Sequence, residues 1–133
     1  QALSVINYAD RLLGDGTVPA ADIDQRVDLF AERLVNRRAM TIARTETLNA
    51  ANSGQRLLWE QMVDEGHLDP QRMIQSWIIT PDDKLCPLCA QMVGDRRDAE
   101  IGGTFNTPIG PKQGPTLHPL CRCGVRLRRR PAT

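Results

Sequence analysis

Cysteine and histidine side chains are concentrated in two short segments of the chain. Residues 86–89 read Cys-Pro-Leu-Cys and residues 118–123 read His-Pro-Leu-Cys-Arg-Cys; we call them the first and second hooks. Together they contain all 4 cysteines and one of the 2 histidines. Zn²⁺ prefers four such ligands in a tetrahedron, and two hooks joined by a loop supply them with little strain. The spacing therefore predicts a single structural zinc centre.

Five side chains compete for the four ligand positions: Cys86, Cys89, His118, Cys121 and Cys123. Cys86 and Cys89 can meet one ion because they form a C-x-x-C hook. In the second hook, Cys121 and Cys123 would share one face of an extended strand, whereas His118 and Cys121 would meet across a turn. We therefore expect Cys86, Cys89 and either Cys121 or Cys123 to bind, and His118 or the remaining cysteine to take the fourth position.

Such a closed ligand shell has no open position for water, so it predicts a scaffolding role rather than Lewis-acid catalysis. Two disulfides or four unliganded thiols are the alternatives. Disulfides require an oxidising compartment, of which the sequence gives no sign. The spacing of the two hooks therefore favours zinc.

The chain has 133 residues, enough for one domain with a modest core. Aromatic residues make up only 4% of it, so the core must depend on aliphatic side chains, which suits helices packed through small residues. Because the sequence begins at Gln1 rather than Met, we expect a fragment of a larger protein. No segment approaches the roughly 20 apolar residues of a membrane span, so no span is predicted.

Residues 1–70 have the pattern of a helical region. Apolar residues recur at helical spacing over about residues 2–13, and a capping-box signal at Asp22 begins a second helix. A third apolar stripe covers about residues 40–65, and Gly66 follows it as the predicted C-cap. The pattern predicts about three helices, without a clear signal for where the second one ends.

Residues 71–133, which we call the lobe, differ in composition. Residues 74–80 predict a short strand that leads through a turn to the first hook. Residues 94–116 contain 5 glycines and 3 prolines and show no helical period, so they predict a long irregular loop with room for one short strand at Thr104-Phe105. Zinc would clamp this loop at both ends. Over residues 123–128 apolar and basic residues alternate, as in a half-buried strand that pairs with the first one. The fold class is therefore α+β, with a helical region followed by a small zinc-clamped lobe of short antiparallel strands, which together form one compact unit.

Opposite charges separate along the chain. Residues 1–70 carry 11 acidic and 7 basic side chains, a net charge of −4, whereas the lobe carries 5 acidic and 10 basic ones, a net charge of +5. The basic excess is concentrated in Arg122, Arg126, Arg128, Arg129 and Arg130. Such a cluster could contact a phosphate backbone or an acidic protein surface, although a solvated basic tail is the commoner explanation. No aromatic residues are interleaved with it, so stacking on single-stranded bases is disfavoured.

Several motifs, taken in order, resemble those of a phage protein family. They are the helical segment Ala43-Arg44-Thr45-Glu46-Thr47, Trp77 ahead of Asp83, the first hook, Gly94 and the second hook. Over about residues 40–127 the chain resembles the phage head morphogenesis family typified by phage Mu protein F. The most specific element is the C-x-x-C hook followed by His-Pro-x-Cys-Arg-Cys.

The resemblance implies a minor head (capsid) protein of a tailed phage or prophage, acting near the portal vertex in head morphogenesis and in DNA packaging or delivery. Its expected partners are the portal and other head proteins, and the five arginines could contact packaged DNA. Its expected location is the head of the virion, after assembly in the cytoplasm of the bacterial host. No catalysis by this domain is implied. We also expect Arg44 or Glu46 to reach the lobe and fix it against the helices.

A zinc-dependent DNA-binding module and a treble-clef-like nuclease are the alternatives. A nuclease of that kind needs a histidine as general base beside a second metal. The only histidine outside the hooks is His67, and the sequence has no Asp-His pair and no Asn-x-x-x-His run. Asp82 and Asp83 could bind a divalent ion, but adjacent carboxylates at a turn are more often solvated or capping. We therefore predict that the chain is not an enzyme and assign no catalytic residues.

Overall fold

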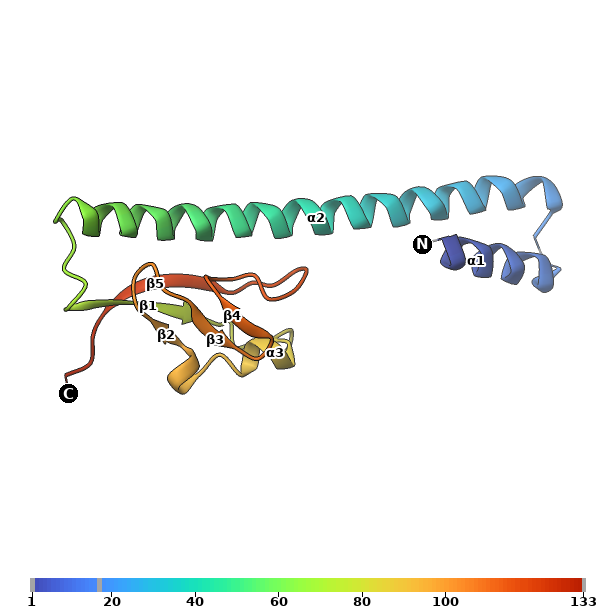
Figure 1. Ribbon diagram of the computed structural model, residues 1–133. Coiled ribbons are helices and arrows are strands. Elements are labelled where there is room, and N and C mark those ends of the chain that lie inside the picture. The colour runs from blue at the N-terminus through green and yellow to red at the C-terminus, as the bar shows by residue number, and fades with distance from the viewer. Residues whose placement is uncertain (1, 17, 133) are drawn as a thin grey trace. The chain divides into compact units, whose positions relative to one another are not determined.

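The computed structural model describes residues 2–16 and 18–132 of the chain. Contacts divide the chain into two compact units, Gln1–Ala43 and Arg44–Thr133. In chain order the elements are α1 (Ala2–Asp15), α2 (Ala20–Asp64), β1 (Met73–Ile78), α3 (Pro87–Ala90), the 3-10 helix η1 (Gly94–Arg96), β2 (Asp98–Ala99), β3 (Phe105–Thr107), β4 (Gly110–Lys112) and β5 (Gly124–Arg129) (Figure 1). The second unit therefore contains the last part of α2 as well as the lobe.

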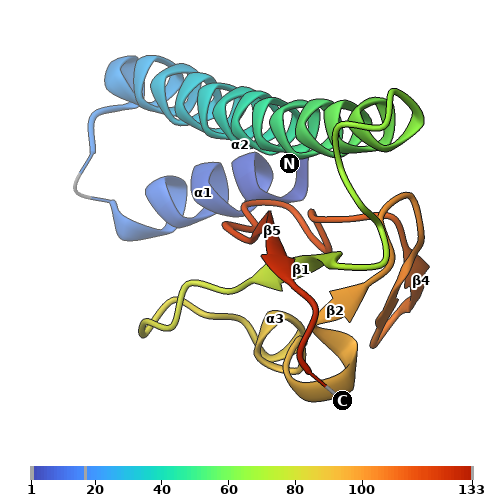
Figure 2. The ribbon, with the colours of Figure 1, turned by 90° about the vertical axis from the view of Figure 1, so that its left-hand side faces the viewer.

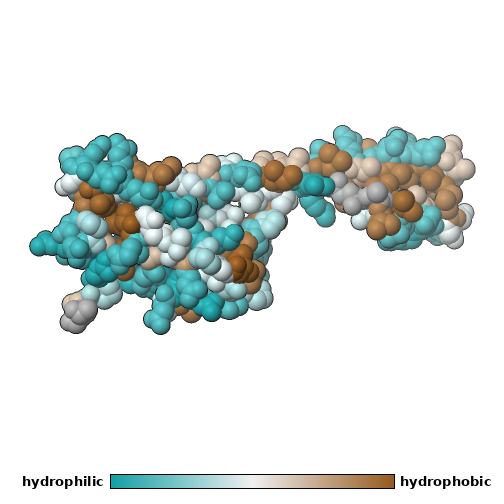
Figure 3. Space-filling model, in the orientation of Figure 1, coloured by the Kyte–Doolittle hydropathy of each residue, from teal (hydrophilic) through white to brown (hydrophobic). Residues whose placement is uncertain are grey.

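The first unit consists of α1 and the beginning of α2. The rings of Tyr8 and Phe30 stack between the two helices, with their centroids 4.3 Å apart and their planes inclined by 20°. Other apolar side chains of this unit remain exposed, among them Leu3 at 75% and Leu13 at 64%. In the space-filling view, apolar side chains gather over these helices between polar margins (Figure 3). Among residues 3–16 and 18–43, none is buried.

Helix α2 is one continuous helix of 45 residues, where the sequence predicts two helices. The helical region therefore contains two helices rather than about three. The physical reason is that no proline or glycine lies between Ala20 and Ser53, so nothing in this stretch breaks the backbone hydrogen bonds. The helix also begins before the predicted cap residue Asp22, which therefore lies in its first turn. A carboxylate at this position is stabilised by the positive end of the helix dipole.

The end of α2 confirms the predicted C-cap. Gly66 has a φ of +77°, in the left-handed region that glycine adopts without strain. Its N–H donates to the carbonyl of Val63 at 3.0 Å, and the N–H of His67 donates to the carbonyl of Met62 at 2.8 Å. These bonds satisfy carbonyls that the helix end would leave unpaired. The chain can then reverse direction toward the lobe.

The lobe confirms the predicted α+β fold and its strand pairing. Strands β1 and β5 are antiparallel neighbours in a three-stranded sheet of order β2-β1-β5, with Trp77 opposite Val125. The short strand expected at Thr104-Phe105 overlaps β3, and the rest of the expected loop over residues 94–116 is more ordered than the sequence predicts. It contains η1, β2 and the hairpin of β3 and β4. These strands are only two or three residues long, too short to leave a periodic pattern in the sequence.

The core of the second unit lies around Trp77. The rings of Trp77 and Phe105 meet edge to face with centroids 5.2 Å apart, and the two residues are 1% and 0% exposed. Met92 and three cysteines belong to the same buried cluster, and Trp59 of α2 joins it. Burying each large apolar side chain contributes roughly 1.5–3 kcal/mol. The last turns of α2 accordingly lie beside the sheet (Figures 1 and 2).

In the described part of the chain, no helix combines the length and the apolar content that crossing a membrane requires.

Candidate metal centre

The first hook forms the start of the short helix α3. Cys86 is its N-cap, with extended backbone angles, and Pro87 occupies the first turn. The Sγ of Cys86 accepts a hydrogen bond from the N–H of Cys89 at 3.2 Å. Proline suits this position because its fixed φ matches the helix and its missing N–H is not needed there. The turn places the Cys86 and Cys89 side chains on the same side.

The second hook is a tight turn followed by the entry into β5. The N–H of Cys121 donates to the carbonyl of His118 at 3.1 Å. Leu120, with a φ of +61°, reverses the chain inside this turn. The turn brings the side chains of His118 and Cys121 to face the first hook.

Two side chains of α2 hold the second hook in place. The hydroxyl of Thr45 accepts the N–H of Leu120 at 3.1 Å, and the amide of Asn52 donates to the carbonyl of Cys123 at 3.3 Å. The predicted anchors Arg44 and Glu46 are instead exposed. The sequence does signal the right segment, because Thr45 lies between them, but spacing alone could not identify which side chain faces the lobe.

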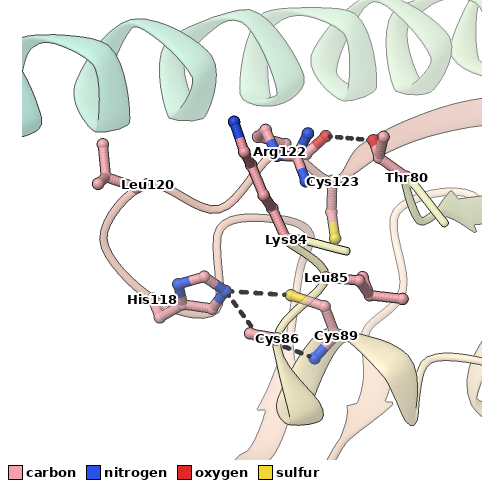
Figure 4. A pocket seen from close by; sticks show the side chains of 9 residues that line it. All are labelled: Thr80, Lys84, Leu85, Cys86, Cys89, His118, Leu120, Arg122 and Cys123. Carbon is pink, nitrogen blue, oxygen red and sulfur yellow. Dashed lines mark hydrogen bonds between the residues drawn. The ribbon is translucent and has the colours of Figure 1, made fainter. Parts of the chain in front are cut away.

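The structure brings all five predicted ligands together. Nε2 of His118 lies 2.9 Å from Sγ of Cys86 and 3.2 Å from Sγ of Cys89 (Figure 4). Sγ of Cys89 lies 3.7 Å from Sγ of Cys121. Two groups of three ligand atoms result, Cys86-Cys89-His118 and Cys89-Cys121-Cys123, each with its atoms within 4.8 Å of one another. Cys89 belongs to both. This cluster could hold a metal ion.

The sulfur separations fit metal ligation better than a disulfide. All four cysteines are free thiols. The 3.7 Å between the sulfurs of Cys89 and Cys121 far exceeds the S–S bond length of about 2.05 Å. Two thiolates bound 2.3 Å from one tetrahedral ion would be about 3.8 Å apart. The observed spacing is therefore close to that of two ligands on a single ion.

Charge is distributed unevenly over the buried thiols. The hydrogen bond from Cys123 is the main reason that the pKa of Cys121 falls to about 5. Burial is the main reason that the pKa of Cys89 rises to about 12, and the hydrogen bond to Cys121 raises the pKa of Cys123. The thiolate is the form that binds metals. A cation bound by the cluster would therefore replace the protons that its thiols retain.

A small cavity of about 20 Å³ lies beside the cluster (Figure 4). Four of the candidate ligands line it: Cys86, Cys89, His118 and Cys123. Its remaining lining includes the charged side chains of Lys84 and Arg122. A space of this size has room for about one water-sized group. It is too small for an organic substrate, which requires several hundred Å³.

Asp82 is engaged by an arginine of the second hook. Both carboxylate oxygens of Asp82 accept hydrogen bonds from Arg122, one at 2.6 Å. The hydrogen bond from Arg122 is the main reason that the pKa of Asp82 falls to about 2. This ion pair connects the turn before the first hook to the second hook. It also engages Asp82, which is one of the two carboxylates that the sequence indicates as possible ligands of a divalent ion.

Two further arginines of the basic cluster form ion pairs within the lobe. Arg128 binds both carboxylate oxygens of Asp98, with Nε donating at 3.0 Å, and Arg130 binds both oxygens of Glu100 at 2.8 and 2.6 Å. These bonds lower the pKa of each carboxyl group. Among the described residues, no ion pair involves Arg126 or Arg129. Pairing thus reduces the positive charge available to a partner.

Fold and site together define a small α+β domain with a Cys/His cluster that could hold a metal ion. Comparison with known proteins finds no match among family models, curated proteins or solved structures. The activity of the chain has therefore to be inferred from its own residues and their geometry.

Proposed function

We propose that this chain is a zinc-stabilised structural domain of a minor head protein of a tailed phage or prophage. It would act near the portal vertex in head morphogenesis and in DNA packaging or delivery. One observation carries the proposal: the separate segments that resemble the phage head morphogenesis family contact one another around the Cys/His cluster. Thr45 bonds the backbone of Leu120 in the second hook, and that hook faces the first.

The donor set supports zinc as the ion. Thiolate and imidazole ligands favour Zn²⁺ over the hard cations Mg²⁺ and Ca²⁺, which prefer oxygen ligands. Cys89, Cys121 and Cys123 are only 2–3% exposed. A buried site made of protein ligands has the character of a structural centre, because it has no open position for substrate.

The position of the cluster in the fold supports a clamping role. The two hooks precede and follow a segment with three very short strands, β2, β3 and β4. Elements this short contribute little stability by themselves. An ion bound by both hooks would hold the two ends of this segment together. Because the ligands meet only in the folded lobe, the free energy of binding the ion would add to the free energy of folding.

The surroundings of the spare histidine and the acidic turn support a non-catalytic role. His67 has a side chain that is 69% exposed and lies 3.7 Å from Glu65 at the end of α2. Asp82, one of the two acidic candidates for nuclease chemistry, is bound to Arg122. A metal-dependent nuclease would need both kinds of group beside one reacting phosphate.

The zinc centre can be tested with the purified chain. Native mass spectrometry is expected to find one Zn²⁺ per chain, and a strong chelator is expected to lower the melting temperature, because the apo lobe loses its clamp. Restoring Zn²⁺ should restore the melting temperature, whereas Mg²⁺ should not. A chain that carries no zinc and melts identically with chelator would contradict the zinc centre.

The head assignment needs a separate test. The expected result is that the protein co-purifies with the portal in heads of the phage or prophage that encodes it, and that deleting its gene reduces the yield of filled heads. Heads that lack the protein and fill normally without it would contradict this assignment while leaving the zinc centre intact.

A further inference from the structure

We propose that the ion is bound by Cys86, Cys89, His118 and Cys121, and that Cys123 stays outside the coordination sphere. The inference rests on the proposed zinc centre and selects its ligands from the five candidates. It assigns different roles to two buried cysteines that are only two residues apart.

The two hooks contain the same four-residue unit. Residues 86–89 are Cys-Pro-Leu-Cys and residues 118–121 are His-Pro-Leu-Cys, so each places potential ligands at its first and fourth positions. In each unit the N–H of the fourth residue bonds back to the first residue, to Sγ of Cys86 at 3.2 Å and to the carbonyl of His118 at 3.1 Å. Proline at the second position fixes φ in both turns. Each unit therefore supplies two ligands, the first from the start of helix α3 and the second from a turn in which Leu120 has a φ of +61°, and Cys123 lies outside this repeat.

Contacts between ligand atoms connect the same four residues. His118 approaches Cys86 at 2.9 Å and Cys89 at 3.2 Å, and Cys89 approaches Cys121 at 3.7 Å. Cys123 is grouped with Cys89 and Cys121 only. It also lines the small cavity beside the cluster, so it is the main competitor of Cys121.

The charge balance favours three cysteines with His118 over four cysteines. Three thiolates and one neutral imidazole around Zn²⁺ leave a net charge of −1, whereas four thiolates would leave −2. Because Cys89, Cys121 and Cys123 are nearly inaccessible to solvent, the smaller charge costs less to bury. Structural zinc takes four ligands, so once His118 is bound only one of Cys121 and Cys123 can join the first hook.

The ligands can be identified in the wild-type chain, without any substitution that might prevent folding. The chain is loaded with ¹¹³Cd²⁺, which replaces zinc at thiolate sites, and couplings between cadmium and cysteine β-protons are recorded by NMR. We expect cross-peaks from Cys86, Cys89 and Cys121 and none from Cys123, with a coupling to Nε2 of ¹⁵N-labelled His118. A cross-peak from Cys123, alone or beside Cys121, would overturn the assignment.

A matched pair of substitutions provides a second test. Cys123→Ser changes a residue outside the coordination sphere and is expected to reduce zinc affinity at most about tenfold, whereas Cys121→Ser removes a ligand sulfur and is expected to reduce it more than about 100-fold. Equal losses, or a greater loss for Cys123→Ser, would overturn the assignment. A wild-type chain that binds neither Zn²⁺ nor Cd²⁺ would instead refute the zinc centre itself, so the two failures are distinguishable.

Discussion

The hydroxyl oxygen of Thr45 accepts the backbone N–H of Leu120 at 3.1 Å, although the two residues are 75 positions apart in the chain. This hydrogen bond connects the helix α2 to the turn that presents His118 and Cys121. A metal site is only as well ordered as the backbone that carries its ligands. Thr45 is therefore expected to influence the metal centre without touching it.

Thr45→Val should lower the free energy of unfolding of the second unit by about 1 kcal/mol, because the hydrogen bond is lost while the side-chain shape is retained. Zinc affinity should fall in parallel. Urea titration followed by tryptophan fluorescence can measure the change, since both tryptophans, Trp59 and Trp77, lie in this unit. Thr45→Ser retains the hydroxyl and is the control. Equal stability of the valine and serine variants would argue against the contact.

Substitutions of Gly66 and Gly54 by alanine should have opposite effects. Gly66 has a φ of +77°, so an added Cβ would be strained and Gly66→Ala should cost about 1 kcal/mol. Gly54 lies inside α2, and a Cβ added there meets nothing within 4 Å. Gly54→Ala should therefore stabilise the chain by roughly 0.5–1 kcal/mol. Thermal melts of the two variants would reveal changes in opposite directions, and a common direction would contradict the description of the helix end.

Phe105 and Ile109 test where the core of the lobe lies. Phe105 is fully buried against Trp77, so Phe105→Ala should lower the free energy of unfolding by about 3–5 kcal/mol. Ile109 lies in the turn of the same hairpin and is 49% exposed, so Ile109→Ala should cost much less. Urea titration of the zinc-loaded variants measures both. Similar losses would indicate that the hairpin is packed differently.

Asp82 should titrate well below an ordinary aspartate. The hydrogen bond from Arg122 lowers its pKa from 3.8 to about 2. Because the folded pKa is the lower one, the stabilisation from this pair is complete above about pH 4 and is lost as the pH falls from about 4 to about 2. NMR of the Asp82 carboxyl carbon in excess zinc should find it still ionised at pH 3.8, the ordinary midpoint. Arg122→Gln should return the pKa toward 3.8, whereas Arg126→Gln should not change it.

Binding of DNA by the isolated chain should be weak at near-physiological salt. Three of the five clustered arginines pair with carboxylates of the lobe, and only Arg126 and Arg129 lack such a pair among the described residues. Two phosphate contacts supply little of the counterion release that drives binding. A gel-shift titration over a range of salt concentrations is expected to give no stable complex. A tight, salt-sensitive complex that Arg126→Gln and Arg129→Gln abolish would favour the DNA-binding module instead.

Local patterns in the sequence were sufficient for several elements of the fold. The alternation after Cys123 predicted β5, and the observed pairing of β1 with β5 confirms it. Gly66 ends α2 as its type and position indicated. Both features depend on residues close together in the chain, where period and backbone preference are visible.

Other elements depend on contacts that local patterns do not contain. Residues 94–116 resemble an irregular loop, yet β3 and β4 form a hairpin there because Phe105 is buried in the core. The sequence predicted two helices where the structure has the single helix α2, and the reason for this error is different. Polar residues interrupt the apolar stripe without interrupting the backbone hydrogen bonds, so a gap in the stripe does not mark a helix end.

For the candidate site, the sequence by itself determined the five side chains that could bind a metal, because ligand type and hook spacing are local properties. Only the tertiary structure decided how they meet. It placed Cys89 between His118 and Cys121 and attached the second hook to Thr45. It also paired Arg122 with Asp82, so the Asp82 carboxylate, which the sequence indicates as a possible ligand of a divalent ion, takes part in an ion pair instead. The physical reason is that ligand separations and ion pairs are set by the packing of distant segments, which no spacing rule along the chain records.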